Sequence, residues 1–524
     1  MNIKQAKEYI KNSVNIYLKK DEFGEYCIPV VRQRPIFLLG APGIGKTAIM
    51  EQIAQEMGIA LVSYSMTHHT RQSALGLPFI AHKVYGGQEF DISEYTMSEI
   101  IASIYETMEE GGLKEGILFL DEINCVSETL APSMLQFLQY KVFGRHRVPD
   151  GWVIVTAGNP PEYNKSVREF DVVTMDRLKL LEVEPDYRIW KEYAQEMQVH
   201  NAILNYLDLK KEHFYHMEMT MKGRSYVTAR GWEDLSEILY HYEEEKLPVD
   251  ESLVGQYIRN DRIVKEFTAY YDLYNKYKKD YRIEEILEGQ ISESAVKRAK
   301  AAAFDERLSL LGMLLDRCLA DMKGVMEQAA HLTEVRALLL AVKNMVTGSR
   351  PEAAASASVS VAACPGQLIT AAECASFVET LEEKKKKQML SLERSNALSK
   401  EDRKKYRWVL RFLQEARKDI YASAAADGAE AFAVIKAKFD AAVADMKQDT
   451  TKAGKQLHYL FTFVEQAFEE GNEMLILVTE LTVNAAGSQF IATFGSPDYQ
   501  RHNQELMLTE RQDDIRSQIA GLQL

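Results

Sequence analysis

The chain has 524 residues, enough for about three domains of ordinary size with large buried cores. Its net charge of −14 at pH 7 argues against a broad nucleic-acid-binding surface. The net charge does not exclude a local basic patch, such as one that lines the pore of a ring. No apolar run approaches the roughly 20 residues of a membrane helix. The N-terminus lacks the apolar core of a signal peptide, and the five cysteines are scattered without a Cys-x-x-Cys pair. These features predict a cytoplasmic protein with reduced thiols.

A short amphipathic helix near the N-terminus precedes a glycine-rich stretch at residues 40–47, the first with recognisable chemistry. The apolar run 35–39 before it reads as a buried strand, and a helix is predicted after it from Lys46 to Met57. This setting indicates a phosphate-binding loop made of Gly40, Ala41, Pro42, Gly43, Ile44, Gly45, Lys46 and Thr47. Glycines let backbone amides approach phosphate oxygens, Lys46 reaches the β- and γ-phosphates, and the Thr47 hydroxyl can ligate Mg²⁺. The alternative is a simple glycine-rich turn.

Two acidic side chains follow another buried strand. After a strand predicted at 59–64 and a helix at 98–110, the apolar residues 117–120 lead directly to Asp121 and Glu122. Such a run is typical of a strand buried on both faces of a parallel sheet, and ligands bind at the carboxyl ends of these strands. Asp121 is then placed to hold Mg²⁺ through water, and Glu122 to polarise the water that attacks the γ-phosphate.

The next predicted strand ends in an asparagine. A helix is predicted from Ser127 to Tyr140 with its first residue as the N-cap, and a basic hairpin or loop at 141–151 leads to a strand at 152–157. Because Asn159 falls at the same end of the sheet as the acidic pair, its amide can donate to a γ-phosphate oxygen or orient the attacking water. Capping of a turn is the alternative. A further strand is predicted at 179–183.

Beyond residue 185 the pattern changes to helices without strands, which predicts a helical lid and then more helices. The segment 348–366 is rich in alanine, serine and valine and reads as a flexible linker. The run from Lys384 to Lys387 reads as a solvated helix face, with a partner or nucleic-acid contact as the alternative. Helices after the linker are predicted at 371–390, 400–421, 432–446 and 455–480, the last broken at Gly471.

These motifs together resemble the AAA+ ATPases, and among them the MoxR-type branch that includes the CbbQ/NorQ-like activators. The resemblance covers roughly residues 20–290. By this resemblance Asn159 is the sensor 1 residue, Arg177 the arginine finger and Arg230 the sensor 2 arginine of the lid. Arg168 is a second candidate for the finger. Beyond the phosphate loop, the matching segments are 75–78, 120–124, 149–152, 157–160, 176–177 and 230–233.

An arginine finger implies assembly, because it lies too far around its own subunit to reach its own nucleotide and points into a neighbour's site in a ring. AAA+ relatives are usually hexameric, so the resemblance implies a hexameric ring of this chain. The alternative for Arg177 is a salt bridge with Asp176 or another surface carboxylate.

The expected fold is an α/β P-loop AAA+ domain with a parallel sheet, followed by a helical lid and an all-helical C-terminal region. The predicted parts are a nucleotide-binding domain at 1–184, a lid at 185–290, a helical extension at 291–347, a linker at 348–366 and an accessory region at 367–524.

The expected activity is hydrolysis of ATP with Mg²⁺ by a ring that remodels or activates a partner protein in a chaperone-like way, although the sequence leaves ATP and GTP open. The resemblance favours a partner with a von Willebrand factor A domain. One competing class is an AAA+ motor on nucleic acid, with Arg145, His146 and Arg147 lining a pore. Another is a nucleotide-switched scaffold without catalysis.

Overall fold

The structure, a computed structural model, describes residues 1–68, 74, 76–143, 145–163, 167–220, 223–347, 369–423, 425–469 and 471–504. The chain forms two compact units. The first comprises Met1–Ile189, Thr228–Gly231 and Lys385–Lys404, and the second comprises Trp190–Val227, Trp232–Lys384 and Lys405–Leu524. The linker predicted at 348–366 lies outside the described residues, and the five-part division of the chain remains a prediction.

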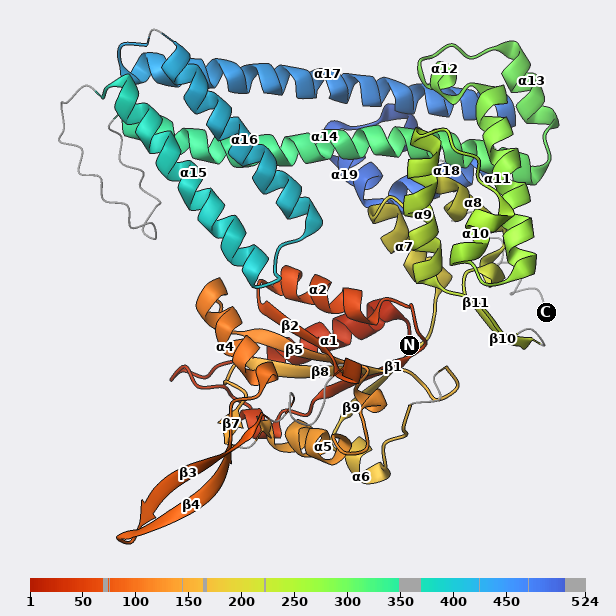
Figure 1. The fold of residues 1–524 in the computed structure, drawn as a ribbon. Helices are drawn as coiled ribbons and strands as arrows, with labels where there is room; N and C mark the ends of the chain where they lie inside the picture. The colour runs from red at the N-terminus through yellow and green to blue at the C-terminus, as the bar shows by residue number, and fades with distance from the viewer. Residues whose placement is uncertain are drawn as a thin grey trace, which may run out of the picture. The chain divides into compact units, whose positions relative to one another are not determined.

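A five-stranded sheet with the order β2-β5-β8-β1-β9 forms the centre of the first unit (Figure 1). Every neighbouring pair in this sheet is parallel, which confirms the predicted α/β architecture. All seven residues of β8 are buried, as expected for a central strand covered on both faces. The strands are β1 (Ile36–Gly40), β2 (Ala60–Ser65), β5 (Gly116–Asp121), β8 (Trp152–Gly158) and β9 (Lys179–Val183).

The helices of the first unit are α1 (Ile3–Tyr17), α2 (Lys46–Met57), α4 (Glu99–Gly111), α5 (Ala131–Tyr140) and α6 (Val172–Met175). Helix α2 begins and ends where the sequence predicts, with Gly58 in the left-handed conformation after its last residue. The prediction that Ser127 caps α5 is wrong. Its hydroxyl contacts Thr129, and α5 begins at Ala131 because Pro132 favours the first helical turn.

Two antiparallel hairpins leave this sheet. Gly86 and Gly87 join β3 (Pro78–Tyr85) to β4 (Gln88–Tyr95), and the two strands form a long hairpin that projects away from the sheet in Figure 1. Several of its large apolar side chains are exposed, among them Ile80, Val84 and Tyr85. The basic segment before β8 forms a short hairpin of β6 (Val142–Phe143) and β7 (His146–Arg147), as predicted.

The second unit is mainly helical. Its elements are α7 (Tyr187–Glu196), α8 (Asn201–Leu209), β10 (His216–Thr220), β11 (Gly223–Val227), α9 (Ala229–Glu244), α10 (Glu251–Tyr257), α11 (Asp261–Tyr281), α12 (Ile283–Leu287), α13 (Glu293–Ala301), α14 (Phe304–Thr347), α15 (Ala371–Arg394), α16 (Lys400–Ala422), α17 (Gly428–Phe468), α18 (Asn472–Val483) and α19 (Ala485–Phe494). Three of these helices, α7, α9 and α16, begin in the first unit, and α15 ends there. The expectation of helices without strands after residue 185 is therefore wrong at β10 and β11, which pair as an antiparallel hairpin.

Helices α14 and α17 lie side by side and antiparallel within this unit (Figure 1). The sequence predicts two helices where α17 is continuous. The polar residues between them stay helical where they contact α14, and Asp449 there accepts a bond from Gln328 of that helix. The hydroxyls of Thr450 and Thr451 bond to carbonyls one turn back in α17, so they are satisfied within the helix. The break predicted at Gly471 is confirmed, since α17 ends at Phe468 and α18 begins at Asn472.

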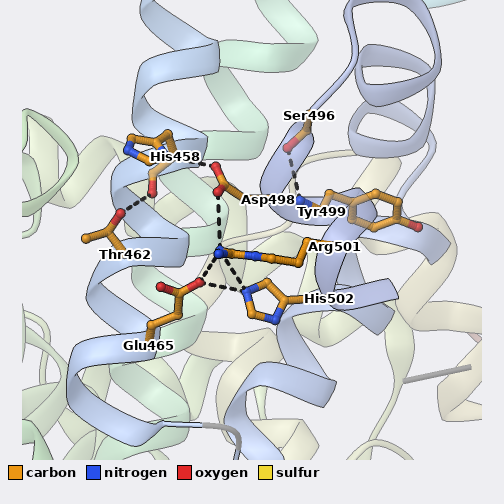
Figure 2. A network of polar contacts seen from close by, with 8 residues as sticks. All are labelled: His458, Thr462, Glu465, Ser496, Asp498, Tyr499, Arg501 and His502. Atoms are coloured by element: carbon orange, nitrogen blue, oxygen red, sulfur yellow. Dashed lines mark hydrogen bonds and ion pairs between the residues drawn. The ribbon is translucent and has the colours of Figure 1, made fainter. Parts of the chain in front are cut away.

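Figure 2 shows the polar network that attaches the segment after α19 to α17. His458 contacts Asp498 at 2.8 Å, and Glu465 accepts from Arg501 and, at 2.7 Å, from Nε2 of His502. The His502 ring is only 6 % exposed and stacks on Phe461. These bonds hold the last described residues against the long helix.

Within the described ranges, no single helix is long and apolar enough to cross a membrane; α18 and α19 meet that test only as a pair bent by 86°.

Candidate nucleotide-binding and catalytic site

The loop at 40–47 joins β1 to α2 and has the backbone that its glycines permit. Gly43 and Gly45 have φ angles of 72° and 91°, in the left-handed region that favours glycine. Gly45 is the residue before α2, so the free amides at the start of that helix face the loop. A Cβ atom at Gly43 would lie 3.0 Å from Cβ of Thr228, a residue just before α9 that belongs to the same unit. The loop is therefore a compact cradle of backbone donors.

Lys46 lies at the centre of this cradle and is 8 % exposed. Its Nζ atom donates to the carbonyl oxygens of Gly40 and Ala41, both at 2.8 Å, and to Oδ1 of Asn159 at 2.9 Å. Burial lowers the pKa of Lys46 to about 8, against the opposing effect of the Asp121 charge. A buried cation held only by neutral oxygens is well suited to a phosphate, whose negative charge would offset the loss of hydration.

Thr47 and Asp121 form the second part of the site. The Thr47 hydroxyl donates to Oδ2 of Asp121 at 2.8 Å, which links the start of α2 to the end of β5. Oδ1 of Asp121 accepts from the backbone N–H of Glu122 at 2.8 Å, so the carboxylate is fixed on both sides. Adjacent hydroxyl and carboxylate oxygens are the ligands that Mg²⁺ prefers, so these two residues fit a Mg²⁺ site. Thr47 would bind the ion directly, and Asp121 through water.

Glu122 follows β5 with φ 55° and ψ 36°, a left-handed conformation that is uncommon for a residue with a side chain. Its Oε2 atom accepts from Ser65 at 3.0 Å and from Thr67 at 3.1 Å. Ser65 is the last residue of β2, the neighbour of β5, and is paired in register with Asp121. No sequence motif marks Ser65 or Thr67. Their place at and just after the end of β2, the strand beside β5, is the feature that would have pointed to them.

Asn159 lies just after β8 and is tied to the phosphate loop through Lys46. Its backbone carbonyl accepts from Nδ2 of Asn124 at 2.8 Å. The approach requires glycine at position 158, because a Cβ atom there would lie 2.5 Å from Oδ1 of Asn124. Asn124 therefore supports the position of Asn159, a role that the sequence analysis did not assign to it.

The three arginines predicted from the resemblance lie in different settings. Arg177 is exposed after α6 and, within the described part of the chain, forms no ion pair with Asp176 or another carboxylate. Its charge lies close enough to Asp171 to add to the effect of the Thr174 hydrogen bonds, which lower the pKa of that carboxyl. Arg168 pairs with Glu128 at 2.5 Å. Arg230 is the second residue of α9 and lies close enough to the phosphate loop for its charge to add to the effect of burial in lowering the pKa of Lys46. Arg177 is not brought to the cradle of its own subunit by any described contact.

The fold and this arrangement define a class, the P-loop nucleotide hydrolases with a parallel sheet. Residues 36–174 match the model of the ATPase family associated with various cellular activities (AAA), a segment that runs from β1 to α6. The first unit thus contains an AAA+ ATPase domain, and the protein is an ATP hydrolase. No curated protein matches the chain.

Proposed function

We propose that this protein is a MoxR-type AAA+ ATPase that hydrolyses ATP in a ring and uses the resulting change of conformation to remodel or activate a partner protein. The observation that carries the catalytic part is the convergence of Lys46, Thr47, Asp121 and Asn159. Their side chains are linked by bonds of 2.8 and 2.9 Å across the carboxyl ends of β1, β5 and β8. Those three strands are neighbours in the sheet, and this edge is where ligands bind in open parallel sheets.

The residues of the site have distinct proposed roles. The amides of the loop at 40–47 and the ammonium of Lys46 bind the phosphates of ATP, and Arg230 of the lid contacts the same anion. Thr47 and Asp121 would hold Mg²⁺, which when bound would neutralise negative charge on the phosphates. Glu122 accepts the proton of the attacking water as general base. Since Oδ1 of Asn159 is engaged by Lys46, its amide N–H groups are the donors that orient the water or a γ-phosphate oxygen.

The ring is supported by the setting of Arg177. An exposed guanidinium without an ion pair among the described residues is available to a neighbouring subunit. There it would neutralise charge that develops on the transferred phosphoryl group, an effect of about 10³ to 10⁵ in rate. Arg168 is the weaker candidate, because it already pairs with Glu128. A closed head-to-tail ring, hexameric by resemblance to AAA+ proteins, would place one finger at each site.

A protein client fits the surface of the first unit better than nucleic acid does. The β3–β4 hairpin presents exposed apolar side chains, including Ile80, Val84 and Tyr85, and such surfaces favour contact with other proteins. A partner with a von Willebrand factor A domain remains the leading candidate from the resemblance.

The alternative of a nucleic-acid motor rests on Arg145, just before β7, and on His146 and Arg147, which form β7. Arg145 pairs with Glu94 of β4, so part of its charge is already neutralised within the unit. Binding of DNA at low salt that is lost in an Arg145→Ala/Arg147→Ala variant would favour the alternative, and no binding at low salt would remove it.

The ring is tested by mixing inactive subunits. Arg177→Ala subunits keep an intact cradle, whereas Lys46→Ala subunits keep an intact finger, so mixed interfaces should combine both and recover hydrolysis. Phosphate release would be measured across mixing ratios, with Lys46→Ala mixed with Glu122→Gln as the matched control. In this control every subunit has a defect in its own nucleotide site, so hydrolysis should not recover. Mixtures that stay inactive although each variant assembles would show that Arg177 does not act in the neighbouring site.

A further inference from the structure

The turn between α15 and α16 belongs to the nucleotide-binding unit, although it lies far from the rest of that unit in the sequence. Residues Lys385–Lys404 group with the parallel sheet, while the chain on either side of them groups with the second unit. Helix α15 ends in a Schellman turn, in which Ala397 bonds back to Leu392 and Asn396 to Glu393. Asn396 has a φ of 52°, a left-handed conformation that asparagine tolerates better than most residues.

This turn is attached to strand β2, the edge of the sheet, through both backbone groups of one residue. The N–H of Leu61 donates to the carbonyl oxygen of Ser395 at 3.1 Å. The carbonyl oxygen of Leu61 accepts from Nδ2 of Asn396 at 3.4 Å. An edge strand has unpaired backbone groups on its outer side, so the turn supplies partners that a further strand would otherwise supply.

The same turn is attached to the end of α4. The hydroxyl of Ser391 donates to the carbonyl oxygen of Gly111 at 2.6 Å. Ser395 is fully buried, and a Cβ atom at Gly111 would lie 2.9 Å from Cβ of Ser395, so the close approach depends on glycine. Two elements of the unit, β2 and α4, are therefore held by one turn.

Both elements support the residues that contact Glu122. Ser65 lies four residues after Leu61 on β2, about 13 Å along the strand, and its hydroxyl donates to Glu122. Tyr64, next to Ser65, contacts Ser103 of α4 through its hydroxyl. A shift of β2 along or away from the sheet edge would thus change the position of Ser65 and Thr67 relative to the Glu122 carboxylate.

We propose that the α15–α16 turn, through Ser391 and Asn396, is a positioning element for ATP hydrolysis. It fixes β2 and α4 so that Ser65 and Thr67 hold Glu122 in place. Neither residue touches the nucleotide site, so both act through β2 and α4. The proposal rests on the proposed role of Glu122 as general base.

The test is a Ser391→Ala/Asn396→Gly variant of the full chain, in which glycine keeps the left-handed turn accessible but removes the amide donor. Gln388→Ala is the matched control, because Gln388 is exposed on α15 one turn before Ser391. We expect kcat to fall about tenfold, a fraction of the 10² to 10⁴ that a positioned base contributes. KM for ATP should change less than about twofold, since the phosphate loop lies on other elements. The Gln388→Ala control should match the parent.

A double-mutant cycle separates positioning from a general loss of structure. In a Ser65→Ala/Thr67→Ala background the turn substitutions should add no further loss of kcat, because both contacts through which they act are already gone. An unchanged kcat, a rise in KM at constant kcat, or a loss that adds fully to that of Ser65→Ala/Thr67→Ala would overturn the proposal. The single Ser391→Ala variant, which removes one hydroxyl, decides the question if the double variant no longer binds ATP.

Glu122→Gln is measured in parallel to separate a failure of the positioning role of the turn from a failure of the proposed role of Glu122. If Glu122→Gln hydrolyses ATP at the parental rate, the assignment of the base is wrong and the positioning proposal falls with it. If Glu122→Gln is inactive while the turn variants behave like the parent, only the positioning proposal is wrong.

Discussion

The Nζ atom of Lys46 donates to Oδ1 of Asn159 at 2.9 Å and so joins the phosphate loop to the end of the neighbouring strand β8. The bond spans 113 residues of sequence and brings a buried cation and an amide to one point. A phosphate entering the cradle would meet both groups at once.

Lys46→Ala should weaken ATP binding by about 100-fold or more, because a charge-assisted contact to phosphate of roughly 3 kcal/mol is lost. Titration calorimetry with ATP and Mg²⁺ measures the effect. Lys19→Ala, at an exposed lysine of the same unit, is the control and should bind like the parent. Unchanged affinity in Lys46→Ala would contradict the assignment of the loop.

ATP affinity should fall as the pH rises above about 8. The pKa of Lys46 is lowered to about 8 by burial, so the ammonium that meets the phosphates is present below that pH and is lost above it. Since binding requires one proton on Lys46, the dissociation constant should rise about tenfold per pH unit beyond the pKa. Affinities measured from pH 7 to 9.5 test this, and a flat profile in the parent would refute it. The Lys46→Ala variant should lack the dependence.

Glu122→Gln should still bind ATP but lower its turnover by about 10² to 10⁴, because the amide keeps the shape of the side chain and cannot accept the proton. Phosphate release gives the rate, and calorimetry gives the affinity. Glu128→Gln is a matched control, since Glu128 is an exposed glutamate of the same unit that pairs with Arg168. Turnover at the parental rate in Glu122→Gln would show that another group is the base.

Arg177→Ala and Arg168→Ala should separate the two candidates for the finger. We expect Arg177→Ala to lose about 10³ in kcat with ATP binding retained, the low end of the range for such residues. Arg168→Ala loses only an exposed ion pair and should stay near the parent. The reverse pattern would assign the finger to Arg168.

Glu465→Ala should destabilise the second unit by about 1 to 3 kcal/mol, because it removes the acceptor shared by Arg501 and the buried His502. Urea unfolding and amide hydrogen exchange along α17 measure the change. Asp440→Ala, at an exposed position of the same helix, is the control. Equal stability of both variants would show that the network of Figure 2 does not hold the segment after α19.

The sequence alone determined the phosphate loop, the parallel strands with their acidic ends and the boundaries of α2. These features are encoded locally. A buried strand reads as a short apolar run, and a phosphate loop requires small residues, lysine and threonine at fixed spacing. Prediction from local sequence was wrong at the polar middle of α17. That segment is helical because its contacts with α14 outweigh its low helix propensity.

Only the tertiary structure placed Ser65 beside Glu122, Asn124 beside Asn159, and the turn at Asn396 on Leu61. Leu61 and Asn396 are 335 positions apart in the sequence. The spacing of apolar residues along one sequence does not show which distant turn pairs with an edge strand. Strand order and the route of the chain decide which surfaces meet. The candidate site residues can therefore be predicted from the loop and strand motifs, whereas the side chains that contact Glu122 cannot.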